Sequence, residues 1–144
     1  MGKKRVVKKF GSSMDNALKA RSLSKLVKRK LTDALLYVES TYNNSRLTLT
    51  DINGSVIVWS TSGSLGFKGA KKGTPFAASK IAEVVGEKAL QAGVKDVKVI
   101  VKGVGSGRES AIRTFASFGF NINSIEDRTG VPHNGPKPKK PRRI

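Results

Sequence analysis

Several residue types that carry common chemistries are missing or rare in this 144-residue chain. It has no cysteine, which excludes disulfides and thiolate metal sites. No apolar run approaches the ~18 residues that a membrane span needs, and no signal-peptide core follows the basic start. We therefore expect a soluble intracellular protein without a membrane partner.

Groups suited to catalysis are also few. The single histidine, His133, lies in a proline-rich stretch and has no evident triad partner. The carboxylates are dispersed among expected strand ends and helices, where turn and cap roles explain them better. Asp51 and Asp127 would form a metal-dependent nuclease site only if the fold brought them together, and no spacing supports that. We expect no catalytic residue, metal, cofactor or small-molecule substrate.

Acidic residues are scarce, ten against 28 lysines and arginines, and the formal net charge is +18 at pH 7. The excess lies at the two ends. Residues 1–30 hold eleven basic residues against Asp15, and residues 128–144 hold six and no acid. Residues 31–127 hold eleven basic and nine acidic residues. A nearly neutral domain thus carries two arms suited to a polyanion, since neutralised phosphates release counterions. The alternative is a solvated, merely soluble surface.

Hydrophobic patterns divide the chain into three parts. Apolar residues recur at helical spacing between 15 and 33, so residues 1–34 are expected to form a basic arm containing an amphipathic helix. This helix folds either in the free chain or only on a partner. Residues 35–127 are expected to form a single α/β domain. Residues 128–144 hold four of the five prolines and no periodicity, which is typical of an extended tail.

The pattern within the domain predicts the element order βββαβαβ. Turn signals at Asn43-Asn44 and Asn53-Gly54 separate the first three strands, which indicates an antiparallel meander. Strands that then alternate with helices pair in parallel. We therefore expect a five-stranded mixed sheet with helices packed on it. The expected strands are 35–41, 46–51, 55–61, 97–102 and 120–127, and the expected helices run from Pro75 to Gly93 and from Arg108 to Phe118.

The stretch LGFKGAKKGTPFAASK, 65–80, places glycines and lysines before a helix that Thr74 is expected to cap. No spacing here matches the Gly-Lys-Ser/Thr of a P-loop, which disfavours a nucleotide. Glycines let the backbone approach a ligand, lysines suit phosphates, and a helix N-terminus offers free amides. We expect a contact with rRNA or DNA phosphates, with a flexible connector as the alternative. The candidates are Gly66, Phe67, Lys68, Gly69, Lys71 and Lys72.

The stretch GVGSGRES, 103–110, has the same arrangement. It departs from GxGxxG because its third glycine, Gly107, comes one residue early. Ser106 is available to cap the following helix, and Arg108 in the first turn opposes the helix dipole unless a phosphate binds there. The alternative is a tight turn that simply requires glycines.

Four aromatic side chains are candidates for stacking on bases: Tyr42, Trp59, Phe67 and Phe76. Trp59 alternates with Ile57 on an expected strand, so we expect it to pack in or beside the core. Phe67 lies in the glycine-rich loop and is the aromatic residue that we expect to be functional.

Three stretches carry a resemblance to a known family. They are NNSRLTLTDINGSVIVWSTSGSLGFKGAKKGTPFAA from Asn43, VKGVGSGRESAIR at 101–113, and VPHNG at 131–135 followed by a basic end. With this spacing, the chain resembles the eleventh small-subunit ribosomal protein in its bacterial form over about a hundred residues. The family usually has prolines where this chain has Val104 and Ser106, so the second glycine-rich loop should be less rigid.

The resemblance implies a non-enzymatic, structural constituent of the small ribosomal subunit, in a bacterial cytoplasm or an organelle. Such a protein binds rRNA on the platform, near the exit-site mRNA path and the Shine-Dalgarno cleft, and bridges rRNA helices. The implied partners also include small-subunit proteins seven and eighteen, mRNA and initiation factor three. Together, the arms, the loops and the resemblance imply rRNA contacts at Lys3, Lys4, Arg5, Lys8, Lys9, Asn43, Asn44, Gly66, Phe67, Lys68, Gly69, Lys71, Lys72, Arg108, Arg113, His133, Asn134, Lys137, Lys139, Lys140, Arg142 and Arg143.

Two other functions remain open at the level of sequence. A free-standing nucleic-acid-binding or chaperone-like module would use the same charges and bind DNA and RNA alike. A divalent-metal nuclease would depend on Asp51 or Asp127. Asn134-Gly135 is also prone to isoaspartate formation, because glycine leaves the attacking backbone nitrogen unshielded.

Overall fold

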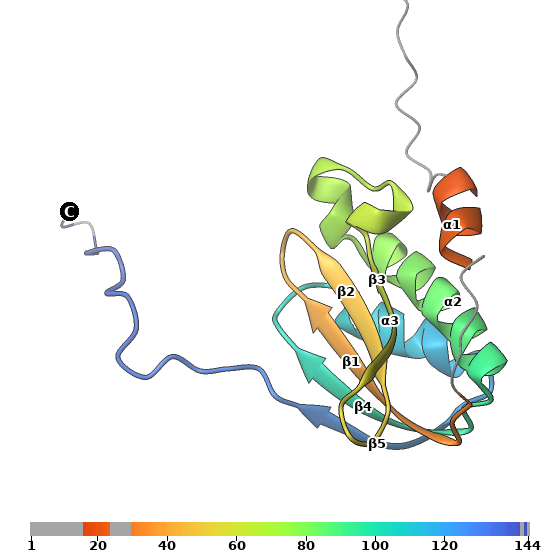
Figure 1. Ribbon diagram of the computed structural model, residues 1–144. Helices are drawn as coiled ribbons and strands as arrows, with labels where there is room; N and C mark the ends of the chain where they lie inside the picture. The colour runs from red at the N-terminus through yellow and green to blue at the C-terminus, as the bar shows by residue number, and fades with distance from the viewer. Residues whose placement is uncertain (1–15, 24–29, 142, 144) are drawn as a thin grey trace, which may run out of the picture.

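A five-stranded mixed sheet carries helices on one face, and an extended tail leaves the sheet at one end (Figure 1). The computed structural model describes residues 16–23, 30–141 and 143. The elements in chain order are α1 (Asn16–Leu23), β1 (Asp33–Ser40), β2 (Ser45–Thr50), β3 (Val56–Thr61), the 3-10 helices η1 (Gly63–Leu65) and η2 (Gly69–Gly73), α2 (Pro75–Ala92), β4 (Asp96–Lys102), α3 (Gly107–Ala116) and β5 (Asn121–Asp127).

The strands lie in the order β3-β2-β1-β4-β5. The first three form an antiparallel meander, and β4 pairs in parallel with both β1 and β5. The β2–β3 turn closes at Gly54, whose φ is 87°. There the Ser55 amide donates a hydrogen bond to Asp51 Oδ1 at 2.8 Å. The predicted element order and the mixed sheet are confirmed.

The core lies between one face of the sheet and helices α2 and α3. The buried strand side chains include Leu36, Val38, Leu47, Leu49, Val97 and Val99. The buried face of α2 includes all five predicted residues, Ala77, Ala78, Ile81, Val85 and Ala89. A Cβ at Gly86 of α2 would lie 2.7 Å from the Phe118 ring, so glycine lets this ring pack directly on the helix. None of the described helices is long and apolar enough to cross a bilayer.

The ends of α2 follow the sequence signals. Thr74 Oγ1 accepts a hydrogen bond from the Ala77 amide at 3.3 Å, and Gly93 follows the helix with a φ of 81°. The predicted cap of α3 is wrong. Ser106 makes no side-chain bond to the helix, and its hydroxyl donates instead to the Gly73 carbonyl oxygen at 3.1 Å. A partner distant in sequence thus takes the hydroxyl that a local cap would use.

The N-terminal helix is shorter than predicted. Of the expected helix at 15–33, α1 confirms residues 16–23, and residues 15 and 24–29 lie outside the described part of the chain. Residues 30–33 are not helical, because the Leu31 amide donates to the Ala92 carbonyl oxygen at 2.9 Å and β1 already begins at Asp33. The boundaries of the domain and its two extensions stay a prediction.

Two aromatic residues have the opposite exposure to that expected from the sequence. Trp59 pairs with Thr48 on the sheet face away from the helices and is 61% exposed, so the expected core packing is wrong. Phe67 is 6% exposed, and its ring meets Phe76 edge-on with centroids 6.0 Å apart. The expectation of a Phe67 ring free to stack on a base is therefore wrong as well. Helices α2 and α3 both lie behind the sheet in Figure 1, so neither of them covers its other face.

Candidate nucleic-acid interface

Four segments meet at the carboxyl end of the parallel strands. Strands β1, β4 and β5 all point toward this end (Figure 1). The turn 41–44 follows β1, the loop 103–107 follows β4, and the tail follows β5. The loop 62–74 reaches the same end before α2. Loops at this end of an open sheet are where ligands bind in many α/β proteins.

The glycines of these loops are close to other parts of the protein. A Cβ at Gly73 would lie 2.1 Å from the Tyr42 carbonyl oxygen, and one at Gly103 would lie 2.1 Å from the Ser40 carbonyl oxygen. A Cβ at Gly105 would lie 2.3 Å from Ser40 Oγ. Close approach to a ligand is therefore the wrong reason for these three glycines, because protein backbone and side chains occupy the space.

Hydrogen bonds hold the first loop against the β1–β2 turn. Ser62 Oγ donates to Asn44 Oδ1 at 2.5 Å, and the Ser62 amide donates to the Ser45 carbonyl oxygen at 3.1 Å. The loop forms η1 and η2 rather than an irregular connector. Asn44 thus has a structural partner, although both it and the neighbouring Asn43 are exposed.

The lysines of this loop carry the charge of the site. Lys68 and Lys71 are exposed and Lys72 is half-buried. Lys71 and Lys72 make no ion pair with the part of the chain that the structure describes, whereas Lys80 lies 2.6 Å from Glu83. Helix α2 begins at Pro75 beside them and has no acidic residue in its first turn. A helix N-terminus carries partial positive charge, so it adds to the attraction of the lysines for an anion.

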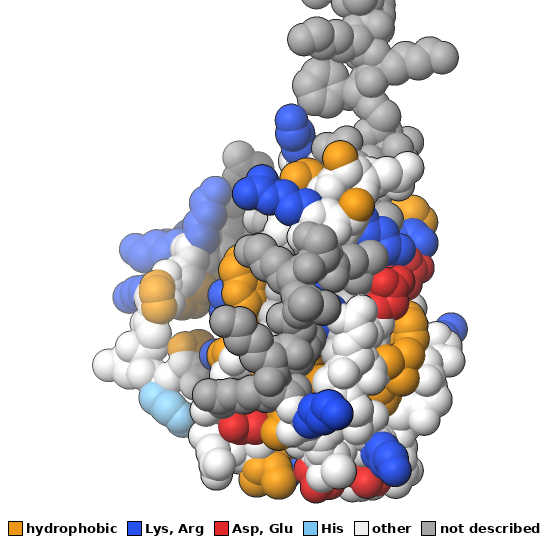
Figure 2. All heavy atoms as spheres, turned by 45° about the vertical axis from the view of Figure 1, so that its right-hand side comes forward, with side chains coloured by type: hydrophobic (Ala, Val, Ile, Leu, Met, Phe, Trp, Pro, Cys, Tyr) orange, Lys and Arg blue, Asp and Glu red, His pale blue; other side chains and the backbone are white. Residues whose placement is uncertain are grey.

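The surface view agrees with this placement of charge. In Figure 2, Lys and Arg side chains crowd the upper part of the domain, and most acidic side chains lie to the right or below. Lys19 of α1 is bound to α2, with its Nζ 3.2 Å from Glu83 Oε2. This contact and the one between α1 and η1 place α1 next to the lysine-bearing loop.

The two arginines of α3 differ in their surroundings. Arg108 Nη1 donates to the Gly103 carbonyl oxygen at 2.7 Å, and its Nη2 donates to Asp127. Arg113 has a side chain that is 78% exposed and pairs with Glu109 one turn away. The sequence showed no sign of the Arg108–Asp127 contact, because it depends on where α3 and β5 meet.

Two acidic residues at the end of β5 are held in their ionised form. Hydrogen bonds from Arg128 and Lys98 lower the pKa of Glu126 to about 2. Hydrogen bonds from the Thr129 hydroxyl and amide, and from Arg108, lower the pKa of Asp127 to about 2. Ionic and polar hydrogen bonds to Glu126 and Asp127 therefore hold the start of the tail against the sheet and α3.

The remaining predicted contacts lie in the two extensions. The tail from 130 to 141 is exposed along its length, and Asn134 has a φ of 54°. This stretch contains His133, Asn134, Lys137, Lys139 and Lys140, and Arg143 is exposed as well. Outside the described residues lie Lys3, Lys4, Arg5, Lys8, Lys9 and Arg142.

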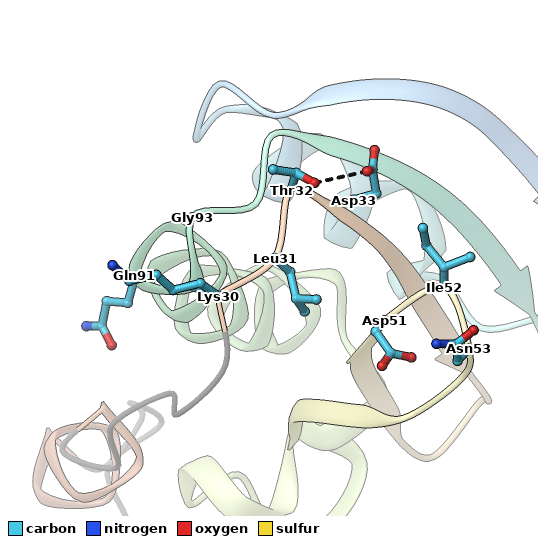
Figure 3. A pocket seen from close by; sticks show the side chains of 10 residues that line it. Lys30, Leu31, Thr32, Asp33, Asp51, Ile52, Asn53, Gln91 and Gly93 are labelled. Carbon is cyan, nitrogen blue, oxygen red and sulfur yellow. Dashed lines mark hydrogen bonds between the residues drawn. The ribbon is translucent and has the colours of Figure 1, made fainter.

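A hollow of about 690 Å³ lies at the other end of the sheet, beside the β2–β3 turn (Figure 3). Its acidic groups have structural partners, since Thr32 Oγ1 donates to Asp33 at 3.0 Å and Asp51 binds the Ser55 amide. Asp51 follows the end of β2 beside the start of β1, whereas Asp127 pairs with the end of β4. The nuclease hypothesis is wrong, because the fold separates its two carboxylates by the length of the sheet.

Comparison with known proteins identifies the family. The family model described as "Ribosomal protein S11" matches residues 34–143. The chain is 49% identical to the small ribosomal subunit protein uS11 of Treponema pallidum over 117 residues, which cover 81% of this chain and 93% of that protein. It is 48% identical to uS11 of Leptothrix cholodnii over 125 residues, which cover 87% of this chain and 93% of that protein. The chain belongs to the ribosomal protein S11 family, whose members are structural, non-enzymatic components of the small ribosomal subunit.

Proposed function

We propose that this protein binds small-subunit rRNA through the carboxyl end of its sheet and bridges rRNA helices on the platform, near the exit-site mRNA path and the Shine-Dalgarno cleft. The observation that carries the rRNA contact is the pair Lys71 and Lys72. They have no ion pair within the described residues and lie beside the N-terminus of α2. The location on the platform is supported by the resemblance of the loop and tail motifs to the family.

The contact surface combines a fixed part and an extended part. The fixed part consists of Asn43 and the loop with Lys68, Lys71 and Lys72, in which Gly69 is also exposed. The extended part is the tail from His133 to Arg143, which supplies charge along a longer stretch of RNA. Such a combination lets one small domain reach more than one rRNA helix.

The protein environment follows from the same proposal. Both relatives come from bacteria, which supports a ribosome in a bacterial cytoplasm rather than an organelle. The neighbouring proteins of this chain in the subunit are small-subunit proteins seven and eighteen. The mRNA and initiation factor three lie close to the same platform.

The test has two parts. The chain should co-sediment with the small subunit when cell lysate is separated on a gradient. Binding of the purified protein to transcribed small-subunit rRNA should fall steeply with salt, with a log–log slope of about −4 to −5 if ~6 phosphates are neutralised. A chain that stays at the top of the gradient and binds DNA and RNA equally would instead be a free-standing nucleic-acid-binding module.

A further inference from the structure

A network of four residues fixes the point where the tail leaves the domain; we call it the tail clamp. It consists of Gly103, Arg108, Asp127 and Thr129. Arg108 donates to the Gly103 carbonyl oxygen at 2.7 Å and to Asp127. The Thr129 hydroxyl donates to Asp127 Oδ1 at 2.6 Å and accepts from the Gly103 amide at 3.2 Å. Each member therefore contacts two others, and the ring joins the second glycine-rich loop to the chain beyond β5.

The clamp sets a sharp boundary in the tail. The Arg128 amide donates to the Val101 carbonyl oxygen at 2.9 Å, which extends the pairing of β5 by one residue. The Thr129 amide donates to Asp127 at 2.9 Å. From residue 130 to 141 the side chains are exposed. Among the tail residues that the structure describes, Thr129 is the last with a hydrogen bond to the domain, and the basic tail leaves the sheet from there (Figure 1).

Arg108 is poorly placed to bind a phosphate itself. Both terminal nitrogens of its guanidinium already donate to protein oxygens, and the side chain is 33% exposed. An approaching phosphate would also meet the negative charge of Asp127. An arginine binds phosphate most strongly when its two terminal nitrogens face it and make two parallel hydrogen bonds, whereas here each terminal nitrogen donates to a protein oxygen.

We propose that Arg108 and Asp127 are positioning residues that hold the root of the tail, so that the basic tail meets rRNA from a fixed direction. This proposal rests on the proposed rRNA binding. A tail that starts from a fixed residue loses less conformational freedom when it binds than one whose root is loose. Asp127 therefore strengthens the binding of rRNA by holding the tail, although its negative charge repels the phosphates.

The decisive variant is Asp127→Ala in the full-length chain. It removes a negative charge, so charge alone predicts tighter binding to transcribed small-subunit rRNA. The clamp predicts binding that is roughly threefold to tenfold weaker, because the root of the tail is released. The matched control is Glu39→Ala, which removes the same charge from the exposed ion pair with Arg46, a residue outside the proposed rRNA contacts. The proposal is overturned if Asp127→Ala binds as tightly as the wild type or more tightly.

A variant with a less charged tail tests whether Asp127 acts through the tail or through another part of the surface. In the variant Lys137→Gln/Lys139→Gln/Lys140→Gln the tail has lost charge, so adding Asp127→Ala should change rRNA affinity by less than about twofold. An undiminished effect of Asp127→Ala in this background would show that the residue acts elsewhere. Arg108→Lys keeps the positive charge but loses the two-pronged guanidinium group. It should weaken rRNA binding without changing the log–log slope of affinity against salt. A slope that falls by about 0.7–0.9 in Arg108→Gln would instead indicate a direct phosphate contact.

An independent readout does not require RNA. The ¹⁵N heteronuclear NOE of Thr129 and Gly130 should fall toward that of a flexible chain in Asp127→Ala, and also in Thr129→Val, which removes only the hydroxyl bonds. Unchanged values in both variants would contradict the proposal. If the wild-type chain shows an ordered Thr129 but no affinity for rRNA, the proposed function fails while the clamp itself stands.

Discussion

The hydroxyl of Ser106 donates a hydrogen bond to the carbonyl oxygen of Gly73 at 3.1 Å and joins two glycine-rich loops that lie 33 residues apart. The first of these loops also packs on the β1–β2 turn, through the close contact of Gly73 with Tyr42. The carboxyl end of the sheet is therefore a single packed unit, from which the lysines and the tail project.

The packing of Gly73 on the turn can be tested by adding one methyl group. Gly73→Ala would place its Cβ 2.1 Å from the Tyr42 carbonyl oxygen, and the backbone must shift to relieve the clash. We expect a loss of about 1–3 kcal/mol in the free energy of unfolding, measured by urea denaturation. The control is Gly130→Ala, whose added Cβ meets no atom within 4 Å. Equal stability of the two variants would contradict the packing role of Gly73.

Lys71 and Lys72, which make no ion pair within the described residues, should contribute to RNA binding and little to stability. In Lys71→Gln/Lys72→Gln, the magnitude of the log–log salt slope for rRNA binding should fall by about 1.4–1.8, which corresponds to two phosphate contacts. The unfolding midpoint should stay close to that of the wild type. Lys30→Gln/Lys95→Gln makes the same charge change at the other end of the sheet and should leave the slope nearly unchanged. Similar slopes for both double variants would mean that the charge acts without regard to position.

Acid should lower the stability of the fold by protonating the two carboxylates at the end of β5. The folded-state pKa values of Glu126 and Asp127 are lowered to about 2, from 4.5 and 3.8. Stability that depends on a lowered pKa is present above the unfolded-state pKa and is lost as the pH falls through the folded-state pKa. We expect the thermal midpoint to decline between about pH 4.5 and pH 2. Asp127→Asn should flatten this decline and Glu109→Gln should not, as followed by circular dichroism.

Because Phe67 is buried and Trp59 is exposed, their replacement should affect stability very differently. Phe67→Ala should cost about 3–5 kcal/mol of unfolding free energy, because it empties a buried site. Trp59→Ala should stay within about 0.5 kcal/mol of the wild type, because the indole is largely solvated. As the chain has a single tryptophan, native fluorescence should also be quenched readily by acrylamide. A strongly protected fluorescence signal would show that Trp59 is covered in solution.

Local signals in the sequence were sufficient for the order of elements. The hairpin at Asn53-Gly54, the cap at Thr74 and the helix end at Gly93 each depend on residues within a few positions of one another. The alternation of apolar residues likewise reports which side of a strand or helix is buried. These features were predicted correctly because the turns and the periodicity act within single elements.

The structure was needed wherever two distant segments meet. The sequence did not show that Ser106 binds Gly73 instead of capping α3, or that Arg108 binds Asp127. It also did not show which face of the sheet helices α2 and α3 cover, or that Trp59 is exposed and Phe67 is buried. The sequence by itself determined the elements and the basic charge of the chain, since these depend on neighbouring residues and on composition. Only the tertiary structure decided which glycines, arginines and aromatic rings face the protein and which face solvent, because that depends on the packing of segments far apart in the chain.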